Sequence, residues 1–263
     1  MAELGRAVIR ADAGARIGAG HVMRCLALAE ALRSEGWQPA FAATQATYEA
    51  VAVLRATAAE KIVVKDAGDA TELADAAGRG TLLIVDHYAL GKAYESACRR
   101  WAARILVIDD LADRSHDCDW LLDQTIGRTA SDYGGLVGHG CAILAGADYA
   151  LLRPEFAALR TTRQIRPDVQ RVFVSLGATD AGGILAELLE EVRAALPQCW
   201  IDVAVGSAAL RLSAIRRAAL RARCALHVDA ANMAALMSQA DVAVLASGST
   251  VLEAACLALP MVV

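Results

Sequence analysis

A histidine between a glycine-rich turn and a helix is the residue best placed for chemistry. His21 follows Gly18 and Gly20, and apolar residues then recur with helical spacing from Val22 to Leu32. We therefore expect His21 in the first turn of a helix. The free N–H groups and positive dipole end of a helix start attract phosphate and disfavour imidazolium. A neutral imidazole beside an anion site is a candidate general base, and the glycines let a ligand approach the main chain.

The same stretch matches neither of two well-known phosphate-binding patterns. Its glycines lack the spacing of a dinucleotide-binding G-x-G-x-x-G, and it lacks the Lys-Ser/Thr of a P-loop. A glycine turn followed by a helix with an incidental histidine explains the residues equally well. The composition of this stretch alone leaves both interpretations open.

Polar residues also follow the apolar runs of the first half. The runs 81–86 and 104–109 are typical of strands buried on both faces, and helical segments alternate with them. This alternation predicts an α/β fold with a parallel sheet, whose ligands bind beyond the carboxyl ends of the strands. The side chains expected at that edge are Asp12, Asp86, His87, Tyr88, Asp109 and Asp110.

Two of these edge residues, Asp12 and Tyr88, are candidate sugar contacts. Asp12 could equally cap a turn or a helix. For Asp109 and Asp110 we favour a structural role, because carboxylates at the end of a buried strand often fix the following loop.

The second half repeats the strand, glycine loop and helix arrangement. A strand at 171–176 leads into the glycine loop 177–183, where Thr179 is a candidate ligand contact. At 246–253 another strand meets a helix start, where Ser249, Thr250 and free amides could hold a diphosphate. Glu253 either completes a capping box with Thr250 or accepts hydrogen bonds from a ligand.

Arg153 and the charged stretch 160–168 lie where the two halves meet. The guanidinium fork of Arg153 suits phosphate, and its alternative is an interdomain salt bridge. We expect domains at 1–160 and 168–263, with 160–168 as the linker. The run 259–263 is typical of a strand that has only begun, so we expect that a C-terminal piece of the second domain is missing.

Composition limits the class of protein. The 263 residues are 56% hydrophobic with a net charge of −4, so we expect a globular protein that does not bind nucleic acid. Seven cysteines without a C-x-x-C pair argue against a disulfide framework, and no zinc-site spacing occurs. No signal peptide or membrane span is expected, which favours a cytoplasmic location. The composition leaves the oligomeric state open.

Motifs along the whole chain resemble one protein family. The chain is similar to the UDP-sugar hydrolases of pseudaminic-acid biosynthesis and the related spore-coat polysaccharide proteins. More distantly, its first glycine loop resembles that of the UDP-GlcNAc transferase that makes lipid II. The motifs that carry the family resemblance are Ile17-Gly-Ala-Gly-His-Val-Met-Arg-Cys, Asp86-His-Tyr, Ile108-Asp-Asp-Leu-Ala-Asp-Arg, Asp148-Tyr-Ala-Leu-Leu-Arg-Pro-Glu-Phe, Val174-Ser-Leu-Gly-Ala-Thr-Asp and Ala246-Ser-Gly-Ser-Thr-Val-Leu-Glu.

The resemblance implies a fold and a reaction. The fold is of the GT-B type, with two Rossmann-like domains facing a cleft. The reaction is hydrolysis of UDP-2,4-diacetamido-2,4,6-trideoxy-β-L-altropyranose, in which His21 activates water for attack at the anomeric carbon with inversion. No cofactor or metal is implied.

The resemblance also implies binding roles for particular residues. Glu253 would bind the ribose, whereas Arg153 and the loops that carry Gly18, Gly20, Thr179, Ser249 and Thr250 would bind diphosphate and sugar. Ala178 stands where the family more usually has a second glycine. Two other functions remain open, a GT-B glycosyltransferase and a non-catalytic module that binds a UDP-sugar.

Overall fold

The computed structural model describes residues 5–14, 17–78 and 81–263. The chain divides into two compact units, one of Met1–Ala13 with His21–Leu151 and one of Gly14–Gly20 with Leu152–Val263. The stretch 160–168, expected to link the domains, therefore lies within the second unit. The reason is that α6 (Pro154–Arg160) places buried Phe156 in the second core, beside Phe173.

The first unit contains a parallel sheet of seven strands in the order β3-β2-β1-β4-β5-β6-β7. Its central strands are apolar and almost fully buried, as strands covered on both faces must be. The strand bounds are β1 Gly5–Ala11, β2 Trp37–Thr44, β3 Glu60–Val64, β4 Thr81–Asp86, β5 Ala102–Ile108, β6 Trp120–Asp123 and β7 Ala142–Ala145.

Helices and 3₁₀ turns connect these strands. The longest helix, α1, directly follows the glycine loop after β1. The helices of this unit are α1 Gly20–Ser34, α2 Gln45–Ala50, α3 Ala52–Ala56, α4 Ala74–Ala77 and α5 Lys92–Cys98, with 3₁₀ turns η1 Ala130–Tyr133 and η2 Ala147–Tyr149. One side of the sheet forms a core in which Val8, Leu83 and Ile105 pack with Tyr94 and Trp101.

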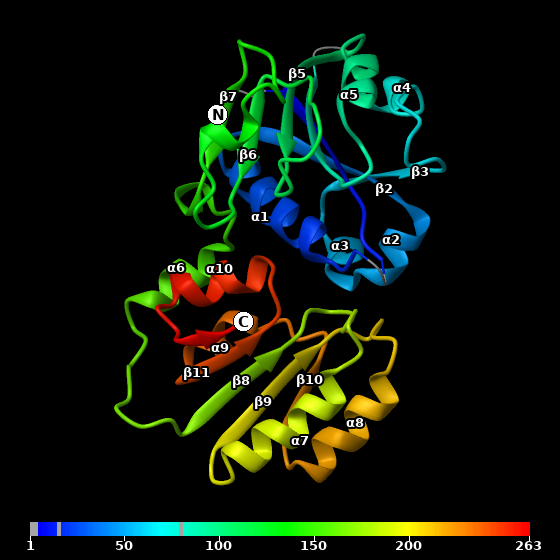
Figure 1. Cartoon of the computed structure of the whole chain (residues 1–263). Helices are drawn as coiled ribbons and strands as arrows, with labels where there is room; N and C mark the ends of the chain where they lie inside the picture. Colours follow the sequence, from blue (N-terminus) through cyan, green and yellow to red (C-terminus); the bar gives the residue numbers. More distant parts are fainter. Residues whose placement is uncertain (1–4, 15–16, 79–80) are drawn as a thin grey trace. The chain divides into compact units, whose positions relative to one another are not determined.

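The second unit contains a parallel sheet of five strands in the order β10-β9-β8-β11-β12. Its strands are β8 Arg171–Ser175, β9 Trp200–Val205, β10 Ala225–Val228, β11 Val242–Leu245 and β12 Met261–Val262. Two layers of helices cover it (Figure 1). One layer is α7 Leu185–Ala195 and α8 Leu212–Arg221, and the other is α6, α9 Met233–Ser238 and α10 Ser249–Cys256.

Both sheets place their first strand in the interior of the strand order. After β1 the chain builds outward through β2 and β3 and then returns to the other side of β1 with β4. The second sheet does the same around β8, with β11 as the returning strand. In open α/β sheets the loops diverge at such positions, and ligands bind there beyond the carboxyl ends of the strands. The α/β class with two Rossmann-like units, expected from the sequence, is confirmed.

Candidate functional site

His21 lies in the first turn of α1, at the carboxyl edge of the first sheet. The helix begins at Gly20, as the sequence predicts, and the imidazole is 5% exposed. Its Nδ1 contacts Oδ1 of Asp86, the last residue of β4. The imidazole therefore lies against a buried carboxylate at the carboxyl end of β4.

Arg24, one turn further along α1, clamps the same carboxylate. Its Nε and Nη2 each donate a hydrogen bond of 2.6 Å, to Oδ2 and Oδ1 of Asp86 respectively. This is the paired-fork geometry in which arginine binds carboxylates most strongly. Burial alone would raise the pKa of Asp86, but the charge and hydrogen bonds of Arg24 hold that pKa well below the usual range. Asp86 is therefore ionised at neutral pH.

An ionised carboxylate fixes the tautomer of its imidazole partner. Asp86 can only accept hydrogen bonds when it is ionised, so Nδ1 of His21 must carry the proton that lies between them. In the neutral imidazole, Nε2 then keeps a free lone pair. A carboxylate orients a catalytic imidazole in the same way in other hydrolases. The arrangement can accept a proton at Nε2.

Tyr88 and Asp110 complete the surroundings of the imidazole. The Tyr88 ring meets the His21 ring edge to face, with centroids 4.4 Å apart. Asp110 accepts a 2.9 Å hydrogen bond from Nη1 of Arg24. Burial, with a smaller contribution from Asp110, raises the pKa of Tyr88. We call His21, Arg24, Asp86, Tyr88 and Asp110 the imidazole cluster.

Asp12 is held by its own neighbours at the same edge. Its Oδ2 accepts a 2.6 Å hydrogen bond from Arg10, and its Oδ1 accepts bonds from the Thr44 amide and the Thr47 hydroxyl at 2.8 and 2.7 Å. His87 Nε2 lies 3.5 Å from Oδ2. Asp12 therefore joins the end of β1 to the start of α2.

The glycine loop between β1 and α1 contains a short bridge. Gly14 and Gly18 exchange two backbone hydrogen bonds of 3.1 and 2.8 Å, and Gly18 has a φ of 71°. A side chain is disfavoured at that φ, so the positive φ expected for this loop is present at Gly18. Residues 15–16 of the loop lie outside the described residues.

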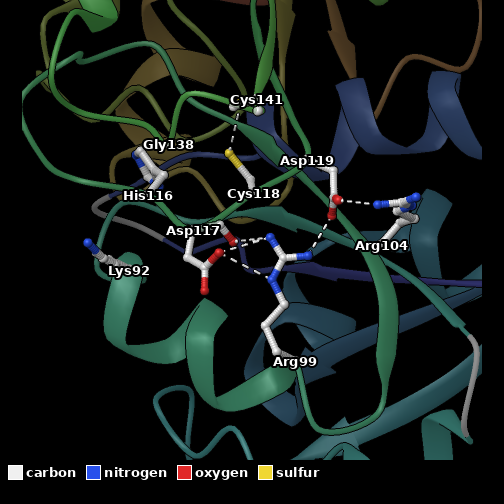
Figure 2. Close-up of a pocket in the computed structure, with 10 residues that line it drawn as sticks. Lys92, Arg99, Arg104, His116, Asp117, Cys118, Asp119, Gly138 and Cys141 are labelled. Carbon is white, nitrogen blue, oxygen red and sulfur yellow. Dashed lines mark hydrogen bonds and ion pairs between the residues drawn. The ribbon is translucent and has the colours of Figure 1, made fainter.

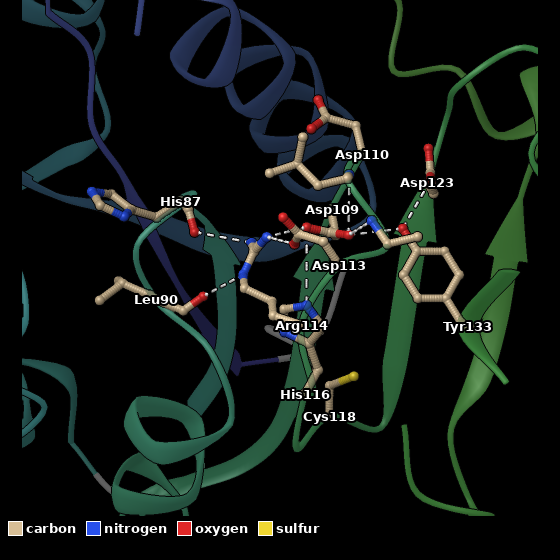
Figure 3. A network of polar contacts seen from close by, with 12 residues as sticks. His87, Leu90, Asp109, Asp110, Asp113, Arg114, His116, Cys118, Asp123 and Tyr133 are labelled. Atoms are coloured by element: carbon tan, nitrogen blue, oxygen red, sulfur yellow. Dashed lines mark hydrogen bonds and ion pairs between the residues drawn. The ribbon is translucent and has the colours of Figure 1, made fainter. Parts of the chain in front are cut away.

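A further polar network fixes the loops after β4 and β5 (Figure 3). Asp109 accepts hydrogen bonds from the Ala112 amide at 2.8 Å and from the Tyr133 hydroxyl at 2.9 Å. Arg114 donates to the carbonyls of His87 and Leu90, at 3.3 and 3.2 Å. Asp109 has the loop-fixing role that the sequence favoured, whereas Asp110 pairs with Arg24 instead.

In the second unit, Thr179 lies on the loop after β8 and is 7% exposed. The Ala178 carbonyl in this loop accepts a 2.8 Å hydrogen bond from Gly206, which follows β9. Asp180 has a φ of 46°, and both of its carboxylate oxygens accept from the Leu185 amide at 3.3 Å. Asp180 thus bonds the first residue of α7 although Ile184 occupies the N-cap position.

Helix α10 follows β11, the strand that pairs with β8. Gly248 is its N-cap, and Ser249 and Thr250 are its first two residues. Since Thr250 lies inside the helix, it cannot form the capping box with Glu253 that the sequence allowed. Glu253 is 9% exposed, and burial raises the pKa of its carboxyl although the charge of Arg153 opposes this.

Arg153 binds Glu253 within the second unit. Its Nε and Nη2 both donate to Oε1 of Glu253, at 3.3 and 2.9 Å, and its Nη1 lies 3.2 Å from Glu155. Among the described residues, no hydrogen bond is formed to Oε2 of Glu253. A salt bridge was the alternative considered for Arg153, and here it joins two residues of one unit. We call Arg153, Thr179, Ser249, Thr250 and Glu253 the α10 site.

A cavity of about 400 Å³ in the first unit does not offer a comparable site (Figure 2). Cys118 and Cys141, which line it, precede β6 and β7, so the cavity lies at the amino ends of these strands. Arg99 there is paired with Asp117 and Asp119, at 2.9 and 2.6 Å. Its guanidinium is therefore not free to bind phosphate.

The described residues contain neither a group of metal ligands nor a membrane-spanning helix. Among those residues, no three or more His, Cys, Asp or Glu side chains are grouped so that they could hold a metal ion. No helix in the same ranges is long and apolar enough to cross a membrane.

Sequence reasoning missed Arg24 and gave Asp86 no role. The signal for Arg24 was its position three residues after His21, which puts both on one face of α1. For Asp86 the signal was a carboxylate at the end of an apolar strand. Neither signal alone predicts that the two side chains meet the same imidazole.

Two known proteins are similar to this chain in amino-acid sequence. The chain is 27% identical over 267 residues to the UDP-2,4-diacetamido-2,4,6-trideoxy-β-L-altropyranose hydrolase of Campylobacter jejuni, covering 95% of this chain and 87% of that one. It is 31% identical over 125 residues to the spore coat polysaccharide biosynthesis protein SpsG of Bacillus subtilis, covering 46% of this chain and 37% of that one. No protein-family model matches the chain.

Solved structures show the fold. Acinetobacter baumannii MurG matches with a TM-score of 0.56 at 13% identity, covering 96% of this chain and 76% of that one. The UDP-GlcNAc 2-epimerase of Neisseria meningitidis matches with a TM-score of 0.54 at 12% identity, covering 98% and 82%. The GT-B type of fold expected from the sequence is confirmed. The chain thus combines that fold with sequence similarity, over nearly its whole length, to a UDP-sugar hydrolase.

Proposed function

We propose that the chain is an enzyme that hydrolyses UDP-2,4-diacetamido-2,4,6-trideoxy-β-L-altropyranose and releases UDP. The observation that carries the proposal is the imidazole of His21, whose Nδ1 contacts ionised Asp86 while Nε2 is left to accept a proton. The similarity to the Campylobacter hydrolase supports the choice of substrate.

In this reaction His21 acts as the general base. The oxygen of a water molecule forms a bond to the anomeric carbon while the bond from that carbon to the UDP oxygen breaks. The water proton passes to Nε2 of His21, and the bonding electrons leave with UDP. Attack opposite the leaving group inverts the anomeric centre. Positioned proton transfer of this kind contributes about 10²- to 10⁴-fold to the rate.

The α10 site would bind the UDP part of the substrate. The free amides of Ser249 and Thr250 at the helix start, and the hydroxyls of Thr179, Ser249 and Thr250, suit a diphosphate. Arg153 holds Oε1 of Glu253 and so directs Oε2 towards the ribose hydroxyls. UDP held in this way is a good leaving group without a separate strong acid.

The first unit would bind the sugar. Tyr88 presents its ring beside His21, and Gly18 and Gly20, in the glycine loop that belongs to the second unit, allow the sugar and phosphate to approach the backbone. Asp12 is committed to Arg10, Thr44 and Thr47, so we assign it the positioning of the loop around the sugar rather than direct contact.

The test is anomer-resolved proton NMR of this UDP-sugar with the purified chain, without an acceptor. We expect UDP and the inverted free sugar to appear. His21→Ala should slow turnover at least 100-fold and leave UDP affinity within about twofold, because the base contributes to chemistry and not to nucleotide binding. The matched control is His139→Ala, which changes an exposed histidine of the same unit and should keep full turnover.

The same experiment separates the alternatives. Full turnover by His21→Ala would refute the assignment of the base. A chain that binds UDP and releases none from the UDP-sugar would be a glycosyltransferase that requires an acceptor or a non-catalytic binding module. The GT-B fold is compatible with transfer as well as with hydrolysis.

A further inference from the structure

A buried arginine stands between two carboxylates beside the imidazole. Arg24 is 6% exposed and donates to both oxygens of Asp86 at 2.6 Å and to Asp110 at 2.9 Å. It thereby joins α1 to the residues at the ends of β4 and β5. Its Nη2 also lies 3.3 Å from Nδ1 of His21.

Arg24 offsets part of the negative charge near the imidazole. Asp86 and Asp110 each carry a negative charge, and Arg24 is the cation that contacts both, so that the three groups together carry one negative charge instead of two. The larger negative charge that would remain without Arg24 favours imidazolium, which has no lone pair with which to accept a proton. The titratable and charged groups that face His21 or its partners are Asp86, Arg24, Cys25, Tyr88 and Asp110, with the Asp12–His87 pair at the same sheet edge.

We propose that Arg24 is a positioning residue, whose fork orients Asp86 and whose charge keeps the imidazole of His21 neutral at the pH of the reaction. The inference rests on the proposed function of His21 as the base. Two opposing effects make the arrangement useful. Asp86 orients the imidazole, but its negative charge also favours a second proton on the ring. The positive charge of Arg24 opposes that second protonation, while its hydrogen bonds hold Asp86 in place.

Two substitutions separate the charge of Arg24 from its geometry. Arg24→Lys keeps the positive charge but loses the planar fork, since a lysine ammonium is a point charge. Arg24→Gln loses both the charge and the fork. Each variant disturbs the packing in a similar way, so a difference between them reports the charge.

The first readout is NMR and does not need turnover. The imidazole signals of His21 are assigned by their absence from His21→Ala among the five histidines of the chain. We expect the pH midpoint of the His21 signals to rise by about one unit or more in Arg24→Gln, the usual effect of one adjacent charge, and by less than half of that in Arg24→Lys. Equal midpoints in the native chain and both variants would overturn the proposal.

The second readout is the pH profile of kcat/KM for UDP release. In Arg24→Gln we expect the acid limb to move to higher pH, so that kcat/KM falls on that limb by up to about tenfold for each unit that the midpoint rises and recovers at higher pH. A purely structural role would lower activity equally at every pH and leave the limb in place. Arg33→Gln, at an exposed arginine near the end of α1, is the matched control and should leave the profile unchanged.

The two measurements also distinguish a failure of the proposed function from a failure of the proposed role of Arg24. If the native chain releases no UDP, the proposed function fails, while the NMR midpoints still decide whether Arg24 controls protonation of His21. If the native chain releases UDP and the midpoints do not move, only the role of Arg24 fails.

Discussion

The imidazole cluster and the α10 site occupy equivalent positions on two similar sheets, yet their chemistry differs. In the first unit, Asp86 is fully buried and bonded on both oxygens by Arg24 and His21. In the second unit, Arg153 bonds one oxygen of Glu253, and Ser249 and Thr250 stand at the start of α10. The first site is an ionic network of buried side chains, whereas the second combines one ion pair with the start of a helix.

The difference matches two tasks. Proton transfer needs a base whose orientation and charge state are fixed before the substrate arrives, and a buried ionic network provides both. Binding of a diphosphate needs donors that are still free, such as the amides at a helix start. The same strand order therefore supports different chemistry because different side chains follow the strands.

The largest effect should come from removing the charge at the centre of the imidazole cluster. Asp86→Asn keeps the size of the side chain but leaves the buried Arg24 with Asp110 as its remaining carboxylate partner. We expect a loss of about 3 kcal/mol in the free energy of unfolding, the low end of the range for breaking a buried ion pair. Urea denaturation measures it, with Asp113→Asn, a largely exposed carboxylate, as the control. A loss below about 1 kcal/mol would mean that the network is not a centre of stability.

A smaller effect should follow from crowding the loop that carries Thr179. A Cβ added at Gly206 would lie 2.6 Å from the Ala178 carbonyl oxygen, whereas one at Gly182 would meet only ordinary contacts. We expect Gly206→Ala to lower the free energy of unfolding by about 1–3 kcal/mol and to weaken UDP binding, because the loop must move. Calorimetry with UDP and thermal denaturation test this against Gly182→Ala. Equal UDP affinity in both variants would show that this loop does not contact the nucleotide.

The smallest expected effect is the change in the free energy of unfolding at low pH. The pKa values of Asp12, Asp86 and Asp109 are lowered in the folded chain, where arginines and hydrogen bonds outweigh burial. Their stabilisation is present above the ordinary value of 3.8 and is lost as the pH falls below it. Burial instead raises the pKa of Glu253 and Asp180, so their contribution is present at low pH and is lost as the pH rises through those values.

Both units should lose stability in acid, because hydrogen bonds and arginines also outweigh burial at Asp202 and Asp241 of the second unit and lower their pKa values. Each carboxylate that must be protonated changes stability by about 1.4 kcal/mol per pH unit. The contrast is therefore between the two sites, and we expect hydrogen exchange, followed from pH 5 to pH 3, to lose protection in α1 at a higher pH than in α10. Earlier loss of protection in α10 would contradict the contrast between the two sites.

The sequence predicted the fold well because its signals are local. Apolar runs such as 81–86 predict buried strands, and the glycine loop before α1 indicates a strand-to-helix junction. The helix start at His21 followed from the same pattern. Side-chain partners are a different matter, because Arg24 and Asp86 meet only after a parallel strand has crossed over and returned beside β1.

Glu253, in the second unit, is another residue whose side-chain partner could not be predicted from the sequence. A Thr-x-x-Glu spacing is a good signal for a capping box, but it does not say at which residue the helix starts. Here the helix starts two residues earlier than that capping box requires, with Gly248 as the N-cap, and Glu253 is available to Arg153. Contacts between segments, rather than spacing within one segment, decided its environment.

The interior position of each first strand also bears on synthesis. β1 obtains its second neighbour only when β4 has been made, and β8 only when β11 has been made. Domains generally fold as units while the chain leaves the ribosome, the N-terminal one first. All seven strands of the first sheet precede residue 146. The nascent chain can therefore assemble His21, Arg24 and Asp86 before the second sheet has been translated, and we expect a stalled chain ending near Leu151 to contain that cluster already formed.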